Sequence, residues 1–432
     1  MIGQDNIFKS HMDSDSVFKG DRDILRPSYI PEQLPHRGEQ IQDLASIMVT
    51  ALRGNRPSNV LIFGKTGTGK TAVVRFLERE VNRLKRENSE TAELDDEFKN
   101  YDIDKVEYVY VNCEVVDTHY GVMKNIGNKF VEEWSDQIPF TGWPMEKVYE
   151  SLREKIDEEP RVVVIILDEL DKLVTKSGDS VLYHLSKINS ELDKSKVSLI
   201  GISNNLKFTE FLDPRVKSRL GEEKMIFPPY DAEQLKDILA DRAGKAFEPE
   251  ILGNDVISLC AALAAQEHGD ARRALDLLRV SAEIAERERD EAVTTDHVYR
   301  AKNKIEQDCV REAVNTLPTH SKLVLYSILL MDENGGDKLT TGEVYSAYSE
   351  LTKRSGMDPL TQRRITDLIS ELDMLGLINA RVKSFGRRGR TKQIQSSVPK
   401  HDIIDLIEDD ESIEPVKNLN IRGDRVKQTK LM

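Results

Sequence analysis

The segment Val60–Thr71, VLIFGKTGTGKT, carries the strongest indication of fold in this chain of 432 residues. It opens with four apolar residues, and Gly64–Thr71 matches the pattern GxxxxGK[ST]. This pattern binds nucleotide phosphates when a strand precedes it and a helix follows it. The segment therefore predicts a phosphate-binding loop between a strand, Val60–Phe63, and a helix that begins near Thr71.

The loop contains the groups that a nucleoside triphosphate needs. The backbone N–H groups of Gly67, Thr68 and Gly69 can surround phosphate oxygens, and the start of the following helix adds partial positive charge. Lys70 can reach the β- and γ-phosphates, and the Thr71 hydroxyl can hold Mg²⁺. We therefore expect the loop to bind ATP or ADP together with Mg²⁺.

A second strand with two carboxylates at its end lies downstream. Val162–Leu167 is six aliphatic residues in a row, as expected for a strand buried on both faces of a parallel sheet, and Asp168 and Glu169 follow it. Ligands of open α/β sheets lie at the carboxyl ends of the strands, so both carboxylates would face the phosphates. Asp168 would hold Mg²⁺, usually through water, and Glu169 would orient and deprotonate the attacking water. An acidic helix start without a catalytic role is the alternative.

Three further positions are candidates with stronger alternatives. Asn204 follows the strand Val197–Ile202 and could hydrogen-bond the water or the γ-phosphate, although an Asn-rich turn gives the same pattern. Arg219 could neutralise transition-state charge in a neighbouring subunit, or be an ordinary surface charge. Arg272 points off the apolar face of its helix and could reach the nucleotide, or pair with Asp276 on the helix surface.

Residues 36–229 and 230–308 differ in their hydrophobic patterns. In the first range, short apolar runs alternate with helical stretches, which indicates an α/β domain with a parallel sheet. The predicted strands are Val60–Phe63, Val106–Val111, Val162–Leu167 and Val197–Ile202. The second range shows only amphipathic helices and predicts a small helical domain. Residues 1–35 would form an arm that is loose up to about residue 25.

Residues 309–400 have the order of a winged helix-turn-helix, three helices and then a basic hairpin. The third helix, Asp358–Leu375, would enter the DNA major groove with Arg363 and Arg364 in its first turns. The arginines expected to contact phosphates from the hairpin are Arg387, Arg388 and Arg390. Small winged domains also bind proteins, so a protein-contact module is the alternative. Residues 401–432 would be a charged tail.

The composition limits the class of protein. The net charge of −14 alone argues against a nucleic-acid binder, yet Arg381–Lys392 carries six basic residues and no acidic one. Such a local field acts over about 10 Å and can bind a polyanion on an acidic protein. Three widely spaced cysteines argue against a zinc site and fit a reducing cytoplasm. No apolar run approaches the ~18 residues of a membrane span, and the N-terminus does not predict a secretory signal.

Several stretches, taken together and in order, resemble the archaeal replication initiators of the origin-recognition type. These are AAA+ ATPases related to eukaryotic origin-recognition subunits and to the helicase-loading cell-division-cycle factor. The resemblance covers about residues 16–398. It depends on VFKGDRDILRPSYIPEQLPHRGEQ (17–40), FGKTGTGKT (63–71), IPFTG (138–142), ILDELDKL (166–173), GISNNL (201–206), DPRVKSRLGEEKMIFPPY (213–230), GDARRAL (269–275) and SFGRRGRTK (384–392).

The resemblance implies a fold and further roles. The fold would be an α/β P-loop AAA+ core with a parallel sheet, a helical lid and a C-terminal winged helix-turn-helix domain. Tyr29–Arg37 would line the adenine pocket, and Tyr230 and Arg242 would complete nucleotide binding. A helical insertion around Val116–Val131 would widen the DNA minor groove. Asn204 would be sensor one, Arg272 sensor two and Arg219 the arginine finger.

The function that the resemblance implies is an ATP-regulated initiator that binds double-stranded origin DNA and helps to recruit and load the MCM helicase. Hydrolysis would be slow and act as a switch, with other initiator copies as further partners. We expect no membrane association and a place at the nucleoid in the cytoplasm. The main alternative is a signalling or transcription-regulating P-loop ATPase whose winged helix makes protein contacts. A clamp-loader-like partner ATPase is a weaker one.

Overall fold

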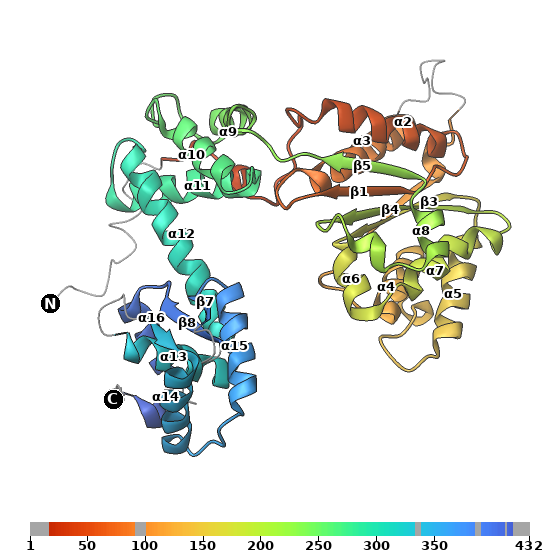
Figure 1. Ribbon diagram of the computed structural model, residues 1–432. Helices are drawn as coiled ribbons and strands as arrows, with labels where there is room; N and C mark the ends of the chain where they lie inside the picture. Colours follow the sequence, from red (N-terminus) through yellow and green to blue (C-terminus); the bar gives the residue numbers. More distant parts are fainter. Residues whose placement is uncertain (1–16, 91–100, 333–337, 385–389, 411–412, 418–432) are drawn as a thin grey trace, which may run out of the picture. The chain divides into compact units, whose positions relative to one another are not determined.

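The computed structural model describes residues 17–90, 101–332, 338–384, 390–410 and 413–417 (Figure 1). The chain divides into two compact units, Met1–Ala301 and Lys302–Met432. Within the described ranges, no helix is both long and apolar enough to cross a bilayer.

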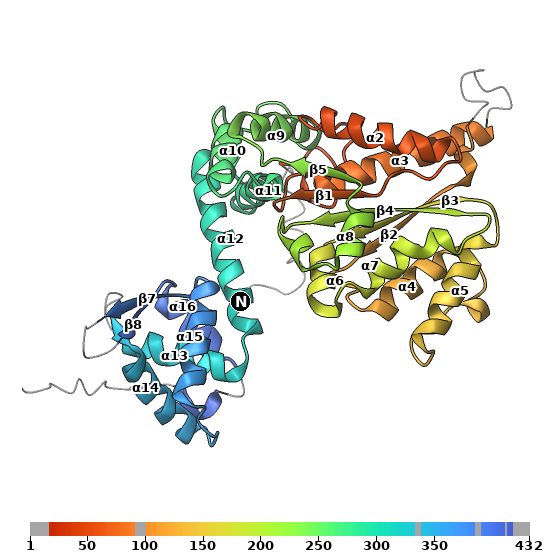
Figure 2. The ribbon, with the colours of Figure 1, turned by 45° about the vertical axis from the view of Figure 1, so that its right-hand side comes forward.

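A five-stranded sheet in the order β2-β3-β4-β1-β5 forms the centre of the first unit (Figure 2). The strands are β1 (Val60–Gly64), β2 (Val106–Asn112), β3 (Val162–Asp168), β4 (Lys196–Ser203) and β5 (Glu223–Phe227). All neighbouring strands are parallel, which confirms the predicted sheet type. Because Asn112 pairs with Asp168, and Phe63 with Ser203, the carboxyl ends of β1 to β4 lie at one edge of the sheet.

Helices cover both faces of this sheet (Figure 2). On one face, α2 (Gly38–Leu52) and α3 (Lys70–Glu90) bury Leu44, Met48 and Val74 against β1, β3 and β4. The helices on the other face are α4 (His119–Gly127), α5 (Met145–Asp157), α6 (Leu170–Ser177) and α7 (Ser180–Lys187). The short α8 (Pro214–Leu220) precedes β5. Burial on both faces explains why Val162–Leu167 is apolar without alternation.

The sequence patterns do not predict the edge strand β5. Only Met225 and Phe227 of its five residues are buried, and Ile226 points to solvent. An edge strand with one solvent-exposed face has no continuous apolar run, and β5 is too short for the alternation of buried and exposed residues to stand out. It pairs with β1 over its whole length, from Glu223 opposite Val60 to Phe227 opposite Gly64.

The lid is the helical domain that the sequence predicts. Its helices are α9 (Ala232–Ala246), α10 (Val256–Gln266), α11 (Ala271–Glu288) and α12 (Thr295–Thr316). The expected boundary at residue 308 falls inside α12, whereas the two compact units divide at Ala301. Val314 near the end of α12 is buried in the core of the second unit, so one continuous helix serves both units and its periodicity does not mark where one ends.

Residues 17–25 are held by the lid and are not the loose arm that the sequence suggests. Phe18 forms a β-bridge with Phe247, and the two rings stack with their centroids 5.2 Å apart. Leu25, in the 3₁₀ turn Arg22–Leu25, is fully buried, and this turn contacts α9 and α11. The few apolar anchors are separated by charged residues, so no periodic pattern predicts them.

The second unit has the winged-helix order. Its helices are α13 (Thr319–Met331), α14 (Thr341–Arg354), α15 (Gln362–Met374) and α16 (Lys400–Glu408), and its strands are β6 (Leu339–Thr340), β7 (Ile378–Ser384) and β8 (Arg390–Ser396). β8 pairs with both other strands in an antiparallel sheet. The recognition helix α15 begins at Gln362, later than the predicted range that starts at Asp358, because Thr361 caps it by accepting from the backbone N–H of Arg364.

The expected tail, residues 401–432, begins inside the folded part of this unit. Ile403 and Ile407 of α16 are buried in the winged-helix core. Lys322 on α13 donates to Asp410 at 2.6 Å, and Tyr326 donates to Glu408 at 2.6 Å. Because acidic residues surround the few buried isoleucines, composition alone gives the wrong assignment for this segment.

Candidate nucleotide-binding site

The phosphate-binding loop has the conformation that its sequence predicts. Gly67 and Gly69 have φ values of 72° and 85°, a region that side chains other than glycine rarely adopt. Lys70, at the start of α3, is 5% exposed and donates to the carbonyl oxygens of Gly64 (2.9 Å) and Lys65 (2.7 Å). Its ammonium therefore lies inside the loop, where phosphate oxygens would replace these acceptors.

The carboxylates at the end of β3 lie beside the loop. The Thr71 hydroxyl donates to Oδ2 of Asp168 at 2.8 Å. Thr71 and Asp168 thus present a hydroxyl and a carboxylate at one point, and such hard oxygen donors fit Mg²⁺. Glu169 has a left-handed φ of 55°, which turns it away from the axis of β3 at the start of α6.

Asn204, at the end of β4, connects the lysine and the glutamate. Its Oδ1 accepts from Nζ of Lys70 at 2.7 Å, and its Nδ2 donates to both carboxylate oxygens of Glu169 at 2.6 Å. The structure therefore brings Lys70, Thr71, Asp168, Glu169 and Asn204 together at one sheet edge. The roles assigned to them from the sequence stay predictions.

A cavity of about 400 Å³ opens beside the loop, between the base and the lid. Its lining contains Gly67, Gly69, Lys70 and Thr71 from the loop and Tyr230, Arg242 and Arg272 from the lid side. Tyr29, Ile30, Pro31, Leu34 and Pro35 supply an apolar wall. An apolar wall next to a phosphate-binding loop suits a purine base, and the adenine pocket expected of residues 29–37 stays a prediction.

Arg242 lines this cavity but its guanidinium is already engaged by the wall. It donates to the carbonyl oxygens of Ile24 (2.9 Å) and Tyr29 (3.3 Å) and lies 4.5 Å from the centroid of the Tyr29 ring. Arg79 of α3 holds the same wall from the other side, through the carbonyl oxygens of Ile30 and Pro31. Arg242 therefore shapes the pocket by holding its backbone.

Arg37 is a site residue that sequence reasoning did not single out. It is 2% exposed and donates to the carbonyl oxygens of Thr68 in the loop (2.9 Å) and Pro228 before the lid (2.7 Å). Its guanidinium lies 3.8 Å from the centroid of the Tyr230 ring. Arg37 thus connects the N-terminal segment to the phosphate-binding loop and to the residues that precede the lid. Nothing in the charge pattern distinguishes it from a surface arginine.

The lid helix α11 begins directly on the loop. The backbone N–H of Ala271 donates to the carbonyl oxygen of Gly67 at 3.2 Å. Asp270 caps this helix, and its Oδ1 lies so close to Gly67 that a Cβ there would be 1.6 Å away. Arg272 follows into the cavity, while Asp276, its suggested partner, pairs with Arg279 at 2.9 Å. The lid and the loop are therefore in contact through α11.

Other predicted residues belong to other elements and are not among the residues that line this cavity. Arg219 is exposed on α8 and does not line it. Arg363 and Arg364 are exposed on α15 of the second unit, where Arg364 pairs with Glu371 at 3.0 Å. Two of the wing arginines, Arg387 and Arg388, lie outside the described residues. Arg390 begins β8.

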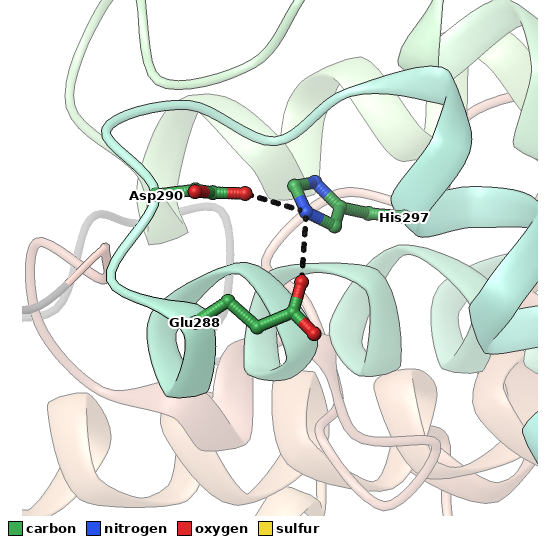
Figure 3. A group of neighbouring side chains, drawn as sticks. All are labelled: Glu288, Asp290 and His297. Atoms are coloured by element: carbon green, nitrogen blue, oxygen red, sulfur yellow. Dashed lines mark ion pairs between the residues drawn. The ribbon is translucent and has the colours of Figure 1, made fainter.

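A cluster of Glu288, Asp290 and His297 in the lid resembles a metal site but is better explained as a helix cap (Figure 3). The backbone N–H of Thr294 donates to Nδ1 of His297 at 3.1 Å, so the ring proton sits on Nε2. That nitrogen lies 3.0 Å from Oδ2 of Asp290 and 3.6 Å from Oε2 of Glu288. In this arrangement Nε2 donates to the carboxylates, and a metal ion would have to displace its proton.

The burial of Lys70 predicts that nucleotide binding depends on pH. Burial lowers the pKa of Lys70 to about 8, although the negative charges of Glu169 and Asp168 act to raise it. Phosphates favour the protonated amine, so binding above this pH must add a proton. We expect the affinity for ADP to fall roughly tenfold or more from pH 7.5 to 9.5. Isothermal titration calorimetry over this range measures it. A Lys70→Arg variant stays protonated and should show a flat profile, and a flat wild-type profile would contradict the prediction.

Comparisons with known proteins agree with this arrangement. Residues 53–207 match the family described as AAA domain, residues 236–303 the Cdc6 AAA+ ATPase-type lid domain, and residues 312–406 the CDC6, C terminal winged helix domain. The ORC1-type DNA replication protein of Pyrococcus furiosus is 52% identical over 424 residues, 98% of this chain and 97% of that protein. The ORC1-type DNA replication protein 1 of Methanosarcina acetivorans is 55% identical over 414 residues, 95% of each chain.

Among solved structures, this chain is similar to the Aeropyrum pernix ORC1 protein in complex with DNA. The two are 44% identical and superpose with a TM-score of 0.80, over 93% of this chain and 100% of that one. At this identity and coverage, the similarity extends through the base, the lid and the winged helix.

Proposed function

Because this chain belongs to the family of ORC1-type DNA replication proteins, it is a replication initiator with an AAA+ ATPase base, and we propose that ATP binding and slow hydrolysis regulate it. In this proposal the protein binds double-stranded origin DNA, at the nucleoid in the cytoplasm, and helps to recruit and load the MCM helicase. Further initiator copies would join it there.

The observation that supports regulation is the contact between α11 and the phosphate-binding loop. Ala271 and Asp270 touch Gly67, whose backbone would face the phosphates, so a change of nucleotide reaches the lid directly. The last lid helix, α12, continues to Thr316 in the second unit. We infer that this shared helix carries a change in the lid to the winged unit.

The residues at the sheet edge support hydrolysis. Lys70 would hold the β- and γ-phosphates, and Thr71 and Asp168 would hold Mg²⁺, which neutralises charge that develops on the phosphates. Glu169 would take the proton of the attacking water, yielding ADP and phosphate. Burial raises the pKa of Glu169, and the hydrogen bonds from Asn204 oppose this rise. A raised pKa makes this carboxylate a better base. Asn204, which is hydrogen-bonded to both Lys70 and Glu169, would contact the attacking water or the γ-phosphate.

The remaining assignments concern contacts outside the cavity. Arg219 is exposed on α8, so as an arginine finger it would act in the site of another copy. Arg363 and Arg364 would face the major groove, where Arg364 must exchange Glu371 for DNA. The wing arginines would contact phosphates. The insertion contains α4, and its role in widening the minor groove is part of the proposal.

Removing basic side chains from the winged unit tests origin binding. Neutralising Arg387, Arg388 and Arg390 is expected to weaken binding roughly tenfold or more and to lower the slope of log affinity against log salt by up to about three, since each phosphate contact adds nearly one. Fluorescence anisotropy and footprinting on repeated motifs upstream of the protein's own gene measure both effects.

The exposed Arg311 on α12, outside the helix-turn-helix, gives a control for the loss of a single positive charge away from the wing, in Arg311→Ala. Its affinity and salt slope should match the wild type. If the wing variant also matches the wild type, or if no repeat is protected, the winged unit does not read origins, and a protein-contact role replaces it.

A further inference from the structure

Strand β2 places a tyrosine against Asp168, the carboxylate that would hold Mg²⁺. Tyr110 lies two residues before the end of β2 and pairs with Ile166 of β3, two residues before Asp168. Its hydroxyl donates to Oδ2 of Asp168 at 2.8 Å. Tyr110 also lines the nucleotide cavity. A side chain from a neighbouring strand therefore touches the carboxylate that would hold Mg²⁺.

Counting donors shows what this contact does to Asp168. Oδ2 accepts from both Thr71 and Tyr110, each at 2.8 Å, which fills both of its lone pairs. Oδ1 accepts from the backbone N–H of Glu169 at 3.0 Å. Among the described donors, this leaves Oδ1 with one lone pair that can face the metal. The two hydroxyls thus fix which oxygen of the carboxylate is available and how the group is rotated.

Arg75 fixes the tyrosine in turn. Its guanidinium lies 3.5 Å from the centroid of the Tyr110 ring, and its NH1 donates to Glu78 at 2.7 Å, one turn along α3. A guanidinium stacked on a phenol ring restricts the ring to one position. Tyr110 is therefore held on its face by Arg75 and at its hydroxyl by Asp168.

We propose that Tyr110 is a positioning residue that orients Asp168 for the magnesium ion of the bound nucleotide. The inference rests on the proposed function, because it concerns the metal of the same ATPase site. Partners that orient a metal ligand commonly change metal affinity ten- to a hundredfold when they are removed. Removing the Tyr110 hydroxyl would therefore weaken metal binding and leave the contacts between the loop and the phosphates unchanged.

The experiment compares Tyr110→Phe with Tyr108→Phe. Tyr108 lies two residues earlier on β2 and on the same face, and its buried hydroxyl has no hydrogen-bond partner among the residues that the structure describes. Both changes remove one phenol hydroxyl from β2, but only one of these hydroxyls touches Asp168. Fluorescent ADP measures nucleotide binding in EDTA, and electron paramagnetic resonance of Mn²⁺ measures metal binding to the protein–ADP complex.

We expect Tyr110→Phe to bind ADP in EDTA within twofold of the wild type and to bind Mn²⁺ about tenfold more weakly. ATP turnover should fall at low Mg²⁺ and recover as Mg²⁺ is raised. Tyr108→Phe should match the wild type throughout. Unchanged Mn²⁺ affinity in Tyr110→Phe, or an equal loss in Tyr108→Phe, would overturn the positioning role. A wild type that binds no metal–nucleotide complex would instead overturn the proposed ATPase function, and this role with it.

Discussion

Replacing Lys70 with alanine is expected to weaken ATP and ADP binding at least a hundredfold. The lysine is buried in the loop and would exchange the carbonyl oxygens of Gly64 and Lys65 for phosphate oxygens. A hydrogen bond to a charged group contributes about 1.5–3 kcal/mol, and each 1.4 kcal/mol is a factor of ten in affinity. Two lost phosphate contacts therefore give a hundredfold loss or more. Fluorescent nucleotide titration measures it.

Lys65→Ala is the matched control, because it removes the same charge from the same loop. The Lys65 side chain is exposed, and only its backbone carbonyl contacts Lys70. This variant should bind nucleotide within about threefold of the wild type, since exposed charges contribute little. Equal losses in both variants would mean that general charge attraction, and not the position of Lys70, holds the nucleotide. Circular dichroism should show that both variants are folded.

The sequence predicts most of the base and of the phosphate site because these parts are local. The loop, its flanking strand and its helix form one continuous segment, Val60–Glu90, and Asp168 and Asn204 directly follow strands whose apolar runs are plain. Parallel strands bring their carboxyl ends to one edge, so residues distant in sequence can be expected to meet. The contacts from Lys70 to Asn204 and from Thr71 to Asp168 lie at this edge.

The parts that the sequence does not predict depend on tertiary contacts with weak local patterns. Arg37 looks like a surface charge, yet it donates to the backbone carbonyls of Thr68 and Pro228, which lie far away in the sequence. Phe18 and Leu25 are anchors without periodicity, and α16 is a helix in an acidic stretch. For Tyr110 a signal exists in the alternation of VEYVYVN, Val106–Asn112, but it becomes visible only when the pairing of β2 with β3 is known.

Replacing Glu169 with glutamine is expected to separate binding from chemistry. Glutamine keeps the size of the side chain and one acceptor for Nδ2 of Asn204, so ATP should bind within about threefold of the wild type. General-base catalysis contributes about 10²–10⁴-fold, so turnover should fall at least a hundredfold. Single-turnover hydrolysis of radiolabelled ATP measures the chemical step without product release.

The control for the Glu169 variant removes a nearby charge that does not touch the site. Glu114 is exposed, and its charge contributes to raising the pKa of Glu169. Glu114→Gln should therefore hydrolyse ATP within a few-fold of the wild type. Near-normal turnover in Glu169→Gln would reject this residue as the base. Another group would then deprotonate the attacking water. If turnover is lost and binding is kept, the variant would hold ATP without hydrolysing it. Its complex with origin DNA should then stay in the ATP-bound state.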